Sequence, residues 1–147
     1  QTNKAKMVAP YSHLVHAVDS TRIYDALSQH IDENTLDVLL QVHIASEASK
    51  FGFLEEELRG LLDSGNETFS SKSIRIRGLM GMATFTQDTK QITQEFKGLR
   101  TFFDELAPSM GPEFDTLSMG MSGDWNIAID EGSTLIRVGS AIFGSRK

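Results

Sequence analysis

Residues 117–124 read Leu-Ser-Met-Gly-Met-Ser-Gly-Asp, and residues 131–144 read Glu-Gly-Ser-Thr-Leu-Ile-Arg-Val-Gly-Ser-Ala-Ile-Phe-Gly. Each segment contains a short apolar run typical of a buried β-strand, followed by glycine and serine residues that can begin a helix. A strand followed at once by a helix is the repeating unit of a parallel α/β sheet. The two segments therefore predict an α/β fold.

The same alternation of strand and helix spacing extends upstream. Strand patterns cover residues 13–18, 37–45, 74–82, 115–121 and 134–138. Apolar residues at helical spacing follow the first four of these, in the stretches 20–31, 54–62, 92–106 and 122–129. The last three helices should end at Gly65, Pro108 and Gly132. Strands that alternate with helices in this way imply right-handed crossovers and a parallel sheet.

Two architectures satisfy this pattern: an open doubly wound sheet, or part of a closed barrel. A complete (β/α)8 barrel takes roughly 200 to 250 residues, so this chain is too short to be one. Both architectures place their ligand sites at the carboxyl ends of the strands. Small residues that would let a ligand approach the backbone stand there, namely Gly81, Gly120, Gly123 and Gly139. Trp125, Phe102 and the methionines are expected in the core or between helices.

Composition narrows the class of protein. The chain has 147 residues, 39% hydrophobic and 23% charged, which fits a single globular domain over residues 1–147. Its net charge of -6 argues against binding to nucleic acid or to an anionic membrane surface. There is no cysteine, no apolar run long enough to span a bilayer and no secretory signal pattern. The default location is the cytoplasm.

Two Gly/Ser turns are candidates for binding a phosphate. The N–H groups at a helix N-terminus are unpaired and favour an anion, and Ser122 adds a hydroxyl after one strand. Gly139 and Ser140 would add backbone donors from the neighbouring strand end. Two such turns that converge after the last strands form the usual phosphate cup of a barrel. The alternative is that Ser122 is only a helix N-cap and Gly139-Ser140 only a tight turn.

Arg137 is the charged residue of the last strand pattern. It precedes Gly139 by two positions, so strand alternation points both to the same face. A cation on the inward face of a parallel strand is unfavourable unless it is paired. Spacing alone favours an ion pair with a neighbouring carboxylate over a contact with a ligand.

These segments resemble the YggS/PLPBP family, the pyridoxal phosphate homeostasis proteins. The resemblance lies in residues 118–124 and 132–146, and continues upstream through residues 77–82 (Arg-Gly-Leu-Met-Gly-Met), residues 42–52 (Val-His-Ile-Ala-Ser-Glu-Ala-Ser-Lys-Phe-Gly) and residues 1–4 (Gln-Thr-Asn-Lys). It implies the C-terminal part, about five strands, of an alanine-racemase-type (β/α)8 TIM barrel that holds pyridoxal 5'-phosphate (PLP) at its mouth.

On this resemblance, Ser122, Gly139 and Ser140 would bind the phosphate of PLP, and Arg137 would face the pyridine nitrogen. The family often has threonine in place of Ser140, which keeps the hydroxyl. A guanidinium keeps its proton near neutrality and so disfavours a protonated pyridine, which makes the ring a poor electron sink. The resemblance thus implies a non-catalytic PLP carrier or regulator in vitamin B6 homeostasis, with PLP-dependent apoenzymes as recipients.

Two other functions stay open. One is a PLP-dependent amino-acid racemase, which would need a lysine on one face of the ring and usually a tyrosine base on the other. Tyr11 and Tyr24 both lie early in the chain. The other is a generic α/β domain that binds a phosphorylated ligand.

The family's Schiff-base lysine is absent from this chain. Members hold PLP on a lysine of their first strand, in an Ala-Val-Ser-Lys-like motif that does not occur here. By alignment with the family, Gln1 falls just after the third strand, so we expect an incomplete PLP-binding barrel that lacks its first strands. Lys50 could still contact the ring side of the site, although a solvated loop lysine is the simpler interpretation. The four histidines, His13, His16, His30 and His43, show no metal-ligand spacing, and His13 and His16 should face opposite ways.

An incomplete barrel has unpaired strand edges and an uncovered interior. Such edges are templates for association between chains. We therefore expect the chain on its own to self-associate.

Overall fold

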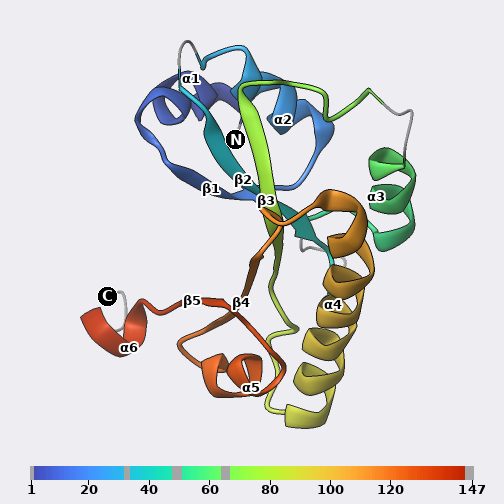
Figure 1. Ribbon diagram of the computed structural model, residues 1–147. Coiled ribbons are helices and arrows are strands. Elements are labelled where there is room, and N and C mark those ends of the chain that lie inside the picture. Colours follow the sequence, from blue (N-terminus) through green and yellow to red (C-terminus); the bar gives the residue numbers. More distant parts are fainter. Residues whose placement is uncertain (1, 32–33, 48–50, 64–66, 145–147) are drawn as a thin grey trace.

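The computed structural model describes residues 2–31, 34–47, 51–63 and 67–144 and contains one parallel sheet of five strands (Figure 1). The strands are β1 (Leu14–Val18), β2 (Leu36–Val42), β3 (Ile74–Gly81), β4 (Thr116–Met121) and β5 (Leu135–Arg137). Their spatial order is β1-β2-β3-β4-β5. A doubly wound sheet reverses its strand order at a switch point, whereas the strands of a barrel follow one another in sequence. The sheet is therefore an arc of a (β/α) barrel, and the doubly wound alternative is wrong.

Four helices connect the strands on the outer side of this arc. They are α2 (Thr21–Ser28), α3 (Glu55–Leu62), α4 (Thr89–Met110) and α5 (Trp125–Asp130). Short helical turns precede β1, namely η1 (Thr2–Lys4), α1 (Ala5–Val8) and η2 (Ala9–Tyr11). After β5 the chain forms α6 (Ser140–Phe143), which Figure 1 shows projecting away from α4. The strand and helix units predicted from the sequence are all present, and β2 ends at Val42 rather than at Ala45.

The hydrophobic core lies between the outer face of the sheet and the helices. Alternate residues of β2, from Leu36 to Val42, are buried there with the apolar stripe of α4, which comprises Ile92, Phe96, Leu99, Phe103 and Leu106. The intervening residues of β2, Asp37, Leu39 and Gln41, belong to the inward face of the arc. This alternation gives the inward face room for polar side chains.

Two local predictions need correction, and a third is not tested. Pro108 lies inside α4, which continues to Met110 and ends at Gly111. A proline in the last turn removes a single helical hydrogen bond, and the packing of Leu106, Ala107 and Met110 against the core outweighs that loss. Trp125 is 43% exposed and is not a core residue, because α5 turns only Ala128 fully inward. Gly65, the expected end of α3, lies outside the described residues.

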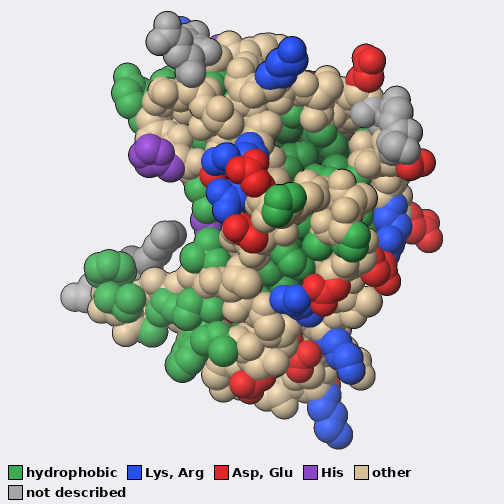
Figure 2. Space-filling model, viewed as in Figure 1, with side chains coloured by type: hydrophobic (Ala, Val, Ile, Leu, Met, Phe, Trp, Pro, Cys, Tyr) green, Lys and Arg blue, Asp and Glu red, His purple; other side chains and the backbone are tan. Residues whose placement is uncertain are grey.

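Charged side chains fill the inward face at the amino ends of the strands. Asp37 accepts hydrogen bonds from Arg75 Nε at 2.7 Å and from Arg77 Nη1 at 3.1 Å, and Arg77 also pairs with Asp115 at 2.8 Å. Figure 2 shows acidic and basic side chains gathered near the middle of the molecule in this view. These paired charges lie at one end of the arc. None of the described helices is long and apolar enough to cross a membrane.

Candidate functional site

The turns that follow β4 and β5 meet at the hydroxyl of Ser122. Its Oγ accepts hydrogen bonds from the backbone N–H groups of Gly139, at 3.1 Å, and Ala141, at 3.3 Å. The N-cap of α5 is Asp124, whose Oδ1 accepts from the N–H of Met121 at 2.6 Å. The interpretation of Ser122 as the cap of α5 is therefore wrong. The two predicted turns share one corner at the carboxyl edge of the sheet.

This corner is open to a ligand. Ser122 is half-buried, and Gly139, Ser140 and Ala141 are exposed. A Cβ atom added at Gly123 or at Gly139 would meet no other atom within 4 Å. Ser140 begins α6 and contributes its carbonyl to the N–H of Gly144. The backbone donor that sequence reasoning missed is Ala141, whose side chain carries no polar signal.

Arg137 extends from β5 across the inward face to the end of β3. Its Nη1 donates to the carbonyl of Ser118 at 3.0 Å and to Ser118 Oγ at 2.6 Å, and its Nη2 donates to the carbonyl of Gly81 at 3.0 Å. The ion pairs found among the described residues do not include Arg137. The carboxylate partner that spacing favoured is therefore not present in this part of the chain.

The electrostatics of Arg137 follow from its burial. Burial lowers the pKa of the Arg137 guanidinium, and the charge of Asp124 acts in the opposite direction. A guanidinium still keeps its proton at neutral pH. The inward face thus holds a partly buried cation whose hydrogen bonds go to neutral oxygens, and such a group suits an acceptor on a ligand.

His16 completes this part of the inward face. Its Nδ1 lies 3.2 Å from Ser118 Oγ, across a separation of 102 residues in the sequence. Burial and the charge of Arg137 lower the pKa of His16. His13 precedes β1 and lies at the other end of the strand. Across the described ranges, no group of three or more metal-ligating side chains comes together.

A second polar network lies at the same edge, after β2 and β3. Glu95 of α4 accepts from the N–H of Thr84 at 2.7 Å and from its hydroxyl at 2.6 Å. Thr84 Oγ1 in turn accepts from the N–H of Ser46 at 2.9 Å and from Gln91 Nε2 at 3.1 Å. The network fixes the two loops next to the site. No motif in the sequence identifies it.

The four glycines at the strand ends differ in the space around them. A Cβ at Gly81 would lie 2.6 Å from Leu99 Cδ2, and a Cβ at Gly120 would lie 2.6 Å from Ala128 Cβ. Helices therefore occupy the space on the Cβ side of these two glycines, and the expectation that a ligand approaches their backbone stays a prediction. Only Gly123 and Gly139 of the four are open.

None of the described lysines belongs to a strand of the sheet. Lys4, Lys6, Lys72, Lys90 and Lys97 are exposed and lie outside the strands. Lys50, the sequence candidate for a ring-side contact, lies outside the described residues, as does Lys147.

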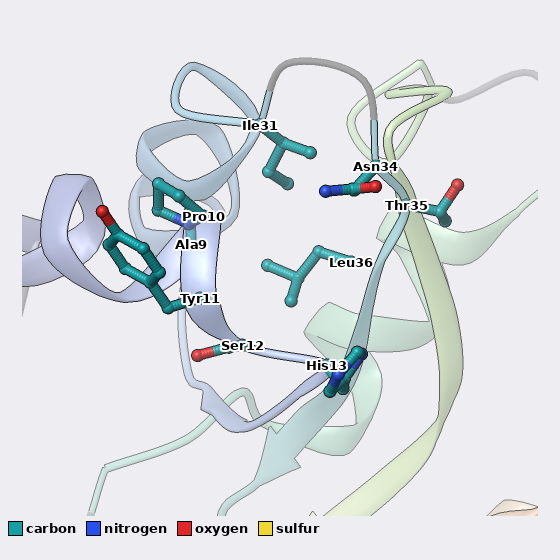
Figure 3. A pocket seen from close by; sticks show the side chains of 9 residues that line it. All are labelled: Ala9, Pro10, Tyr11, Ser12, His13, Ile31, Asn34, Thr35 and Leu36. Atoms are coloured by element: carbon teal, nitrogen blue, oxygen red, sulfur yellow. The ribbon is translucent and has the colours of Figure 1, made fainter.

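A separate pocket of about 290 Å³ lies at the amino ends of β1 and β2 (Figure 3). Residues 9–13, Ile31 and residues 34–36 line it. It is at the opposite end of the strands from Ser122, and the described residues of its lining include no Lys, Arg, Asp or Glu. The N–H groups of Gly139 and Ala141 and the guanidinium of Arg137 lie instead toward the carboxyl edge of the sheet.

The chain is similar in sequence and in structure to known proteins. The chain matches the family described as alanine racemase, N-terminal domain, over residues 1–147. A pyridoxal phosphate homeostasis protein of Vibrio alginolyticus is 39% identical to it, over 99% of this chain and 62% of the relative. The solved structure of PipY from Synechococcus elongatus without PLP superposes with a TM-score of 0.86 at 33% identity, over 98% of this chain and 67% of PipY. PipY with PLP bound superposes with a TM-score of 0.82 at 32% identity, over 98% of this chain and 66% of PipY.

The barrel relationship extends to more distant proteins. Alanine racemase of Corynebacterium glutamicum, 18% identical, has a TM-score of 0.66 over 88% of this chain and 36% of the enzyme, and so shares its fold. The chain spans 62% to 64% of the length of the first curated relatives. Both the partial alanine-racemase-type barrel and the resemblance to the homeostasis proteins are confirmed. The chain belongs to the alanine racemase N-terminal domain family.

Proposed function

We propose that this chain forms the phosphate-binding and ring-nitrogen-binding side of a PLP site, in a protein that buffers and delivers this cofactor in the cytoplasm without catalysing a reaction. The observation that carries the proposal is the convergence of Ser122, Gly139 and Ala141 on one corner beside the partly buried cation of Arg137. The names of the relatives and the PLP bound to PipY support it.

The residues present fit the two ends of the cofactor. Ser122, Gly139 and Ser140 would bind the phosphate, together with the N–H of Ala141. The N–H groups of Gly139 and Ala141, which now donate to Ser122 Oγ, could donate to a phosphate oxygen instead. Arg137 would donate to the unprotonated pyridine nitrogen. When bound, PLP supplies a reactive aldehyde and an aromatic ring. The interpretation of residues 1–147 as an incomplete PLP-binding barrel that lacks its first strands and the cofactor lysine remains part of this proposal.

One feature supports a carrier over a racemase. The sequence has two tyrosines, and neither lies near Arg137. Tyr24 is buried in the outer layer, where its hydroxyl accepts from the N–H of Ser71, and Tyr11 is 87% exposed before β1. A tyrosine base is thus missing from the described site.

Substitution of Ser122 by alanine tests the phosphate corner. We expect Ser122→Ala to weaken PLP binding about tenfold, because a hydrogen bond to a charged group contributes roughly 1.5–3 kcal/mol. Equilibrium dialysis gives the Kd, and phosphorus NMR of the PLP phosphate reports the site itself. Phosphorus NMR does not depend on a covalent bond to lysine.

The matched control is Ser109→Ala. Ser109 Oγ donates to the carbonyl of Leu106 within α4, far from the corner, so the affinity should stay unchanged. Equal affinities of the parent chain and Ser122→Ala would contradict the assignment of the phosphate. Racemisation of L-alanine by the PLP-loaded protein, followed by circular dichroism, would contradict the non-catalytic role.

The exposed edges of the sheet predict self-association. In the described sheet β1 and β5 each pair with one neighbour only, and Ile142 and Phe143 of α6 are 68% and 86% exposed. Unpaired edges and exposed apolar side chains favour contacts between chains. Sedimentation velocity of the 147-residue chain should therefore show dimers or larger species. A monodisperse monomer with a sharp thermal transition would count against this expectation.

A further inference from the structure

Three side chains from three strands form a continuous hydrogen-bonded row on the inward face. Arg137 of β5 donates through Nη1 to Ser118 Oγ of β4 at 2.6 Å, and Ser118 Oγ lies 3.2 Å from His16 Nδ1 of β1. Val15 and Ala17, the neighbours of His16, line an apolar pocket with residues of α1 and α2. Strand alternation therefore directs His16 away from the helices and toward the site.

The positions of the protons in this row follow from its donors. A guanidinium can only donate, so Ser118 Oγ is the acceptor of its bond with Arg137. The hydroxyl hydrogen of Ser118 then needs an acceptor of its own. Ser118 is 0% exposed, so bulk water is not available to it. The acceptor beside it is His16 Nδ1, which requires a neutral imidazole with its hydrogen on Nε2.

We propose that His16 and Ser118 are positioning residues that hold the Arg137 guanidinium toward the ligand, and that they do so only while His16 is neutral. The proposal rests on the proposed function, since it names Arg137 as the group that meets the PLP ring. His16 and Ser118 act through Arg137 and are not assigned a contact with the cofactor. A lower pH should therefore weaken the binding of PLP to this site.

The effect of pH has a definite sign. If His16 carried a proton on Nδ1, Ser118 Oγ would lie between two donors, Arg137 and His16. The hydroxyl hydrogen of Ser118 would then have no acceptor in the row. The same proton would also place a second cation near Arg137. Burial and Arg137 already lower the pKa of His16, so the row is intact at neutral pH and breaks as the pH falls through that lowered pKa.

Other charges around β1 do not offset this effect. Asp37 of β2 is held by Arg75 and Arg77 of β3 at the amino ends of the strands. Arg22 and Asp25 of α2 are exposed on the outer side, and Lys4 lines the outer pocket with Val15 and Ala17. Asp124 acts on Arg137, and Arg137 is the charged group that acts on His16.

Nitrogen-15 NMR of the histidine side chains tests the row without any cofactor. In the parent chain we expect His16 Nδ1 to carry no proton at neutral pH and to titrate below the range of a solvent-exposed histidine. Arg137→Met should raise the pKa of His16, because the neighbouring cation is removed. A proton on Nδ1 at neutral pH, or a pKa of His16 that does not move in Arg137→Met, would overturn the proposal.

Two substitutions of His16 test its effect on PLP binding. Asparagine can place its side-chain oxygen near the position of Nδ1 and does not titrate, whereas phenylalanine keeps a ring without an acceptor. At about pH 7.5 we expect His16→Asn to bind PLP as the parent chain does and His16→Phe to bind roughly tenfold more weakly. Rescue by asparagine separates a positioning role from a merely structural one.

The pH profile supplies the final comparison. PLP has ionisations of its own, which affect the parent chain and His16→Asn equally, so the ratio of their Kd values isolates His16. The ratio should be near unity at about pH 7.5, and the parent chain should become roughly tenfold weaker than His16→Asn by about pH 5. A ratio that stays constant over this range would refute the proposal. If the parent chain binds no PLP at any pH, the proposed function fails, and the NMR titration still decides whether the row exists.

Discussion

Gly78→Ala is expected to lose more than about 4 kcal/mol of the free energy of unfolding, the largest effect of any substitution considered for this chain. Gly78 has φ +155°, and a Cβ built on it would lie 1.7 Å from the carbonyl oxygen of Thr116. Gly78 pairs with Thr116 in the register of β3 and β4. The methyl group would force these strands apart and separate Ser118 from the rest of the site.

Urea unfolding followed by the fluorescence of Trp125 measures this effect. Trp125 is the sole tryptophan and begins α5, directly after β4, so its signal reports the affected region. Gly98→Ala is the matched control, because a Cβ at Gly98 in the middle of α4 would meet nothing within 4 Å. Alanine in a helix interior should add about 0.5–1 kcal/mol of stability there. Similar losses in both variants would contradict the close approach at Gly78.

Arg137→Met is expected to weaken PLP binding at least about tenfold while changing the free energy of unfolding by less than about 1 kcal/mol. The affinity for PLP falls because the hydrogen-bond donor to the ring nitrogen is removed. The free energy of unfolding changes little because two effects oppose each other. The substitution removes the hydrogen bonds to Ser118 and Gly81, but it also removes the cost of partly burying a cation that has no ion pair. Titration of PLP by fluorescence quenching and urea unfolding give the two quantities.

Arg137→Lys distinguishes charge from geometry at this position. Lysine keeps the charge but has a single nitrogen, which cannot reach Ser118 and Gly81 together as the two guanidinium nitrogens do. We expect its affinity for PLP to fall between those of the parent chain and Arg137→Met. A large loss of stability with unchanged PLP affinity in Arg137→Met would show that the arginine is structural.

The sequence predicted the elements well because their signals are local. Apolar side chains that are buried on folding recur at strand spacing in residues 74–82 and 115–121, and at helical spacing along α4. The structure has strands and a helix there. Local rules failed at Pro108 and Trp125. There the outcome depends on how much apolar surface the neighbouring elements cover, which no short window contains.

The candidate site was predicted only in part. Ser122, Gly139 and Ser140 stood out because glycine and serine after a strand favour a turn, and the structure brings Ser122 to Gly139. Ala141 and Ser118 carry no comparable pattern. His16 has no metal-ligand spacing, and its contact with Ser118, 102 residues away in the sequence, leaves no pattern along the chain.

The alternation of strands and helices, the glycine and serine turns after the last two strands and the cation of the last strand can all be predicted from the amino-acid sequence. Hydrophobic periodicity and turn chemistry act over a few residues, so short windows of the chain contain them. The strand order, the contact of Ser122 with Gly139 and Ala141, and the partners of Arg137 become visible in the folded chain. Those contacts depend on the curvature of the sheet, which results from the packing of all its strands together.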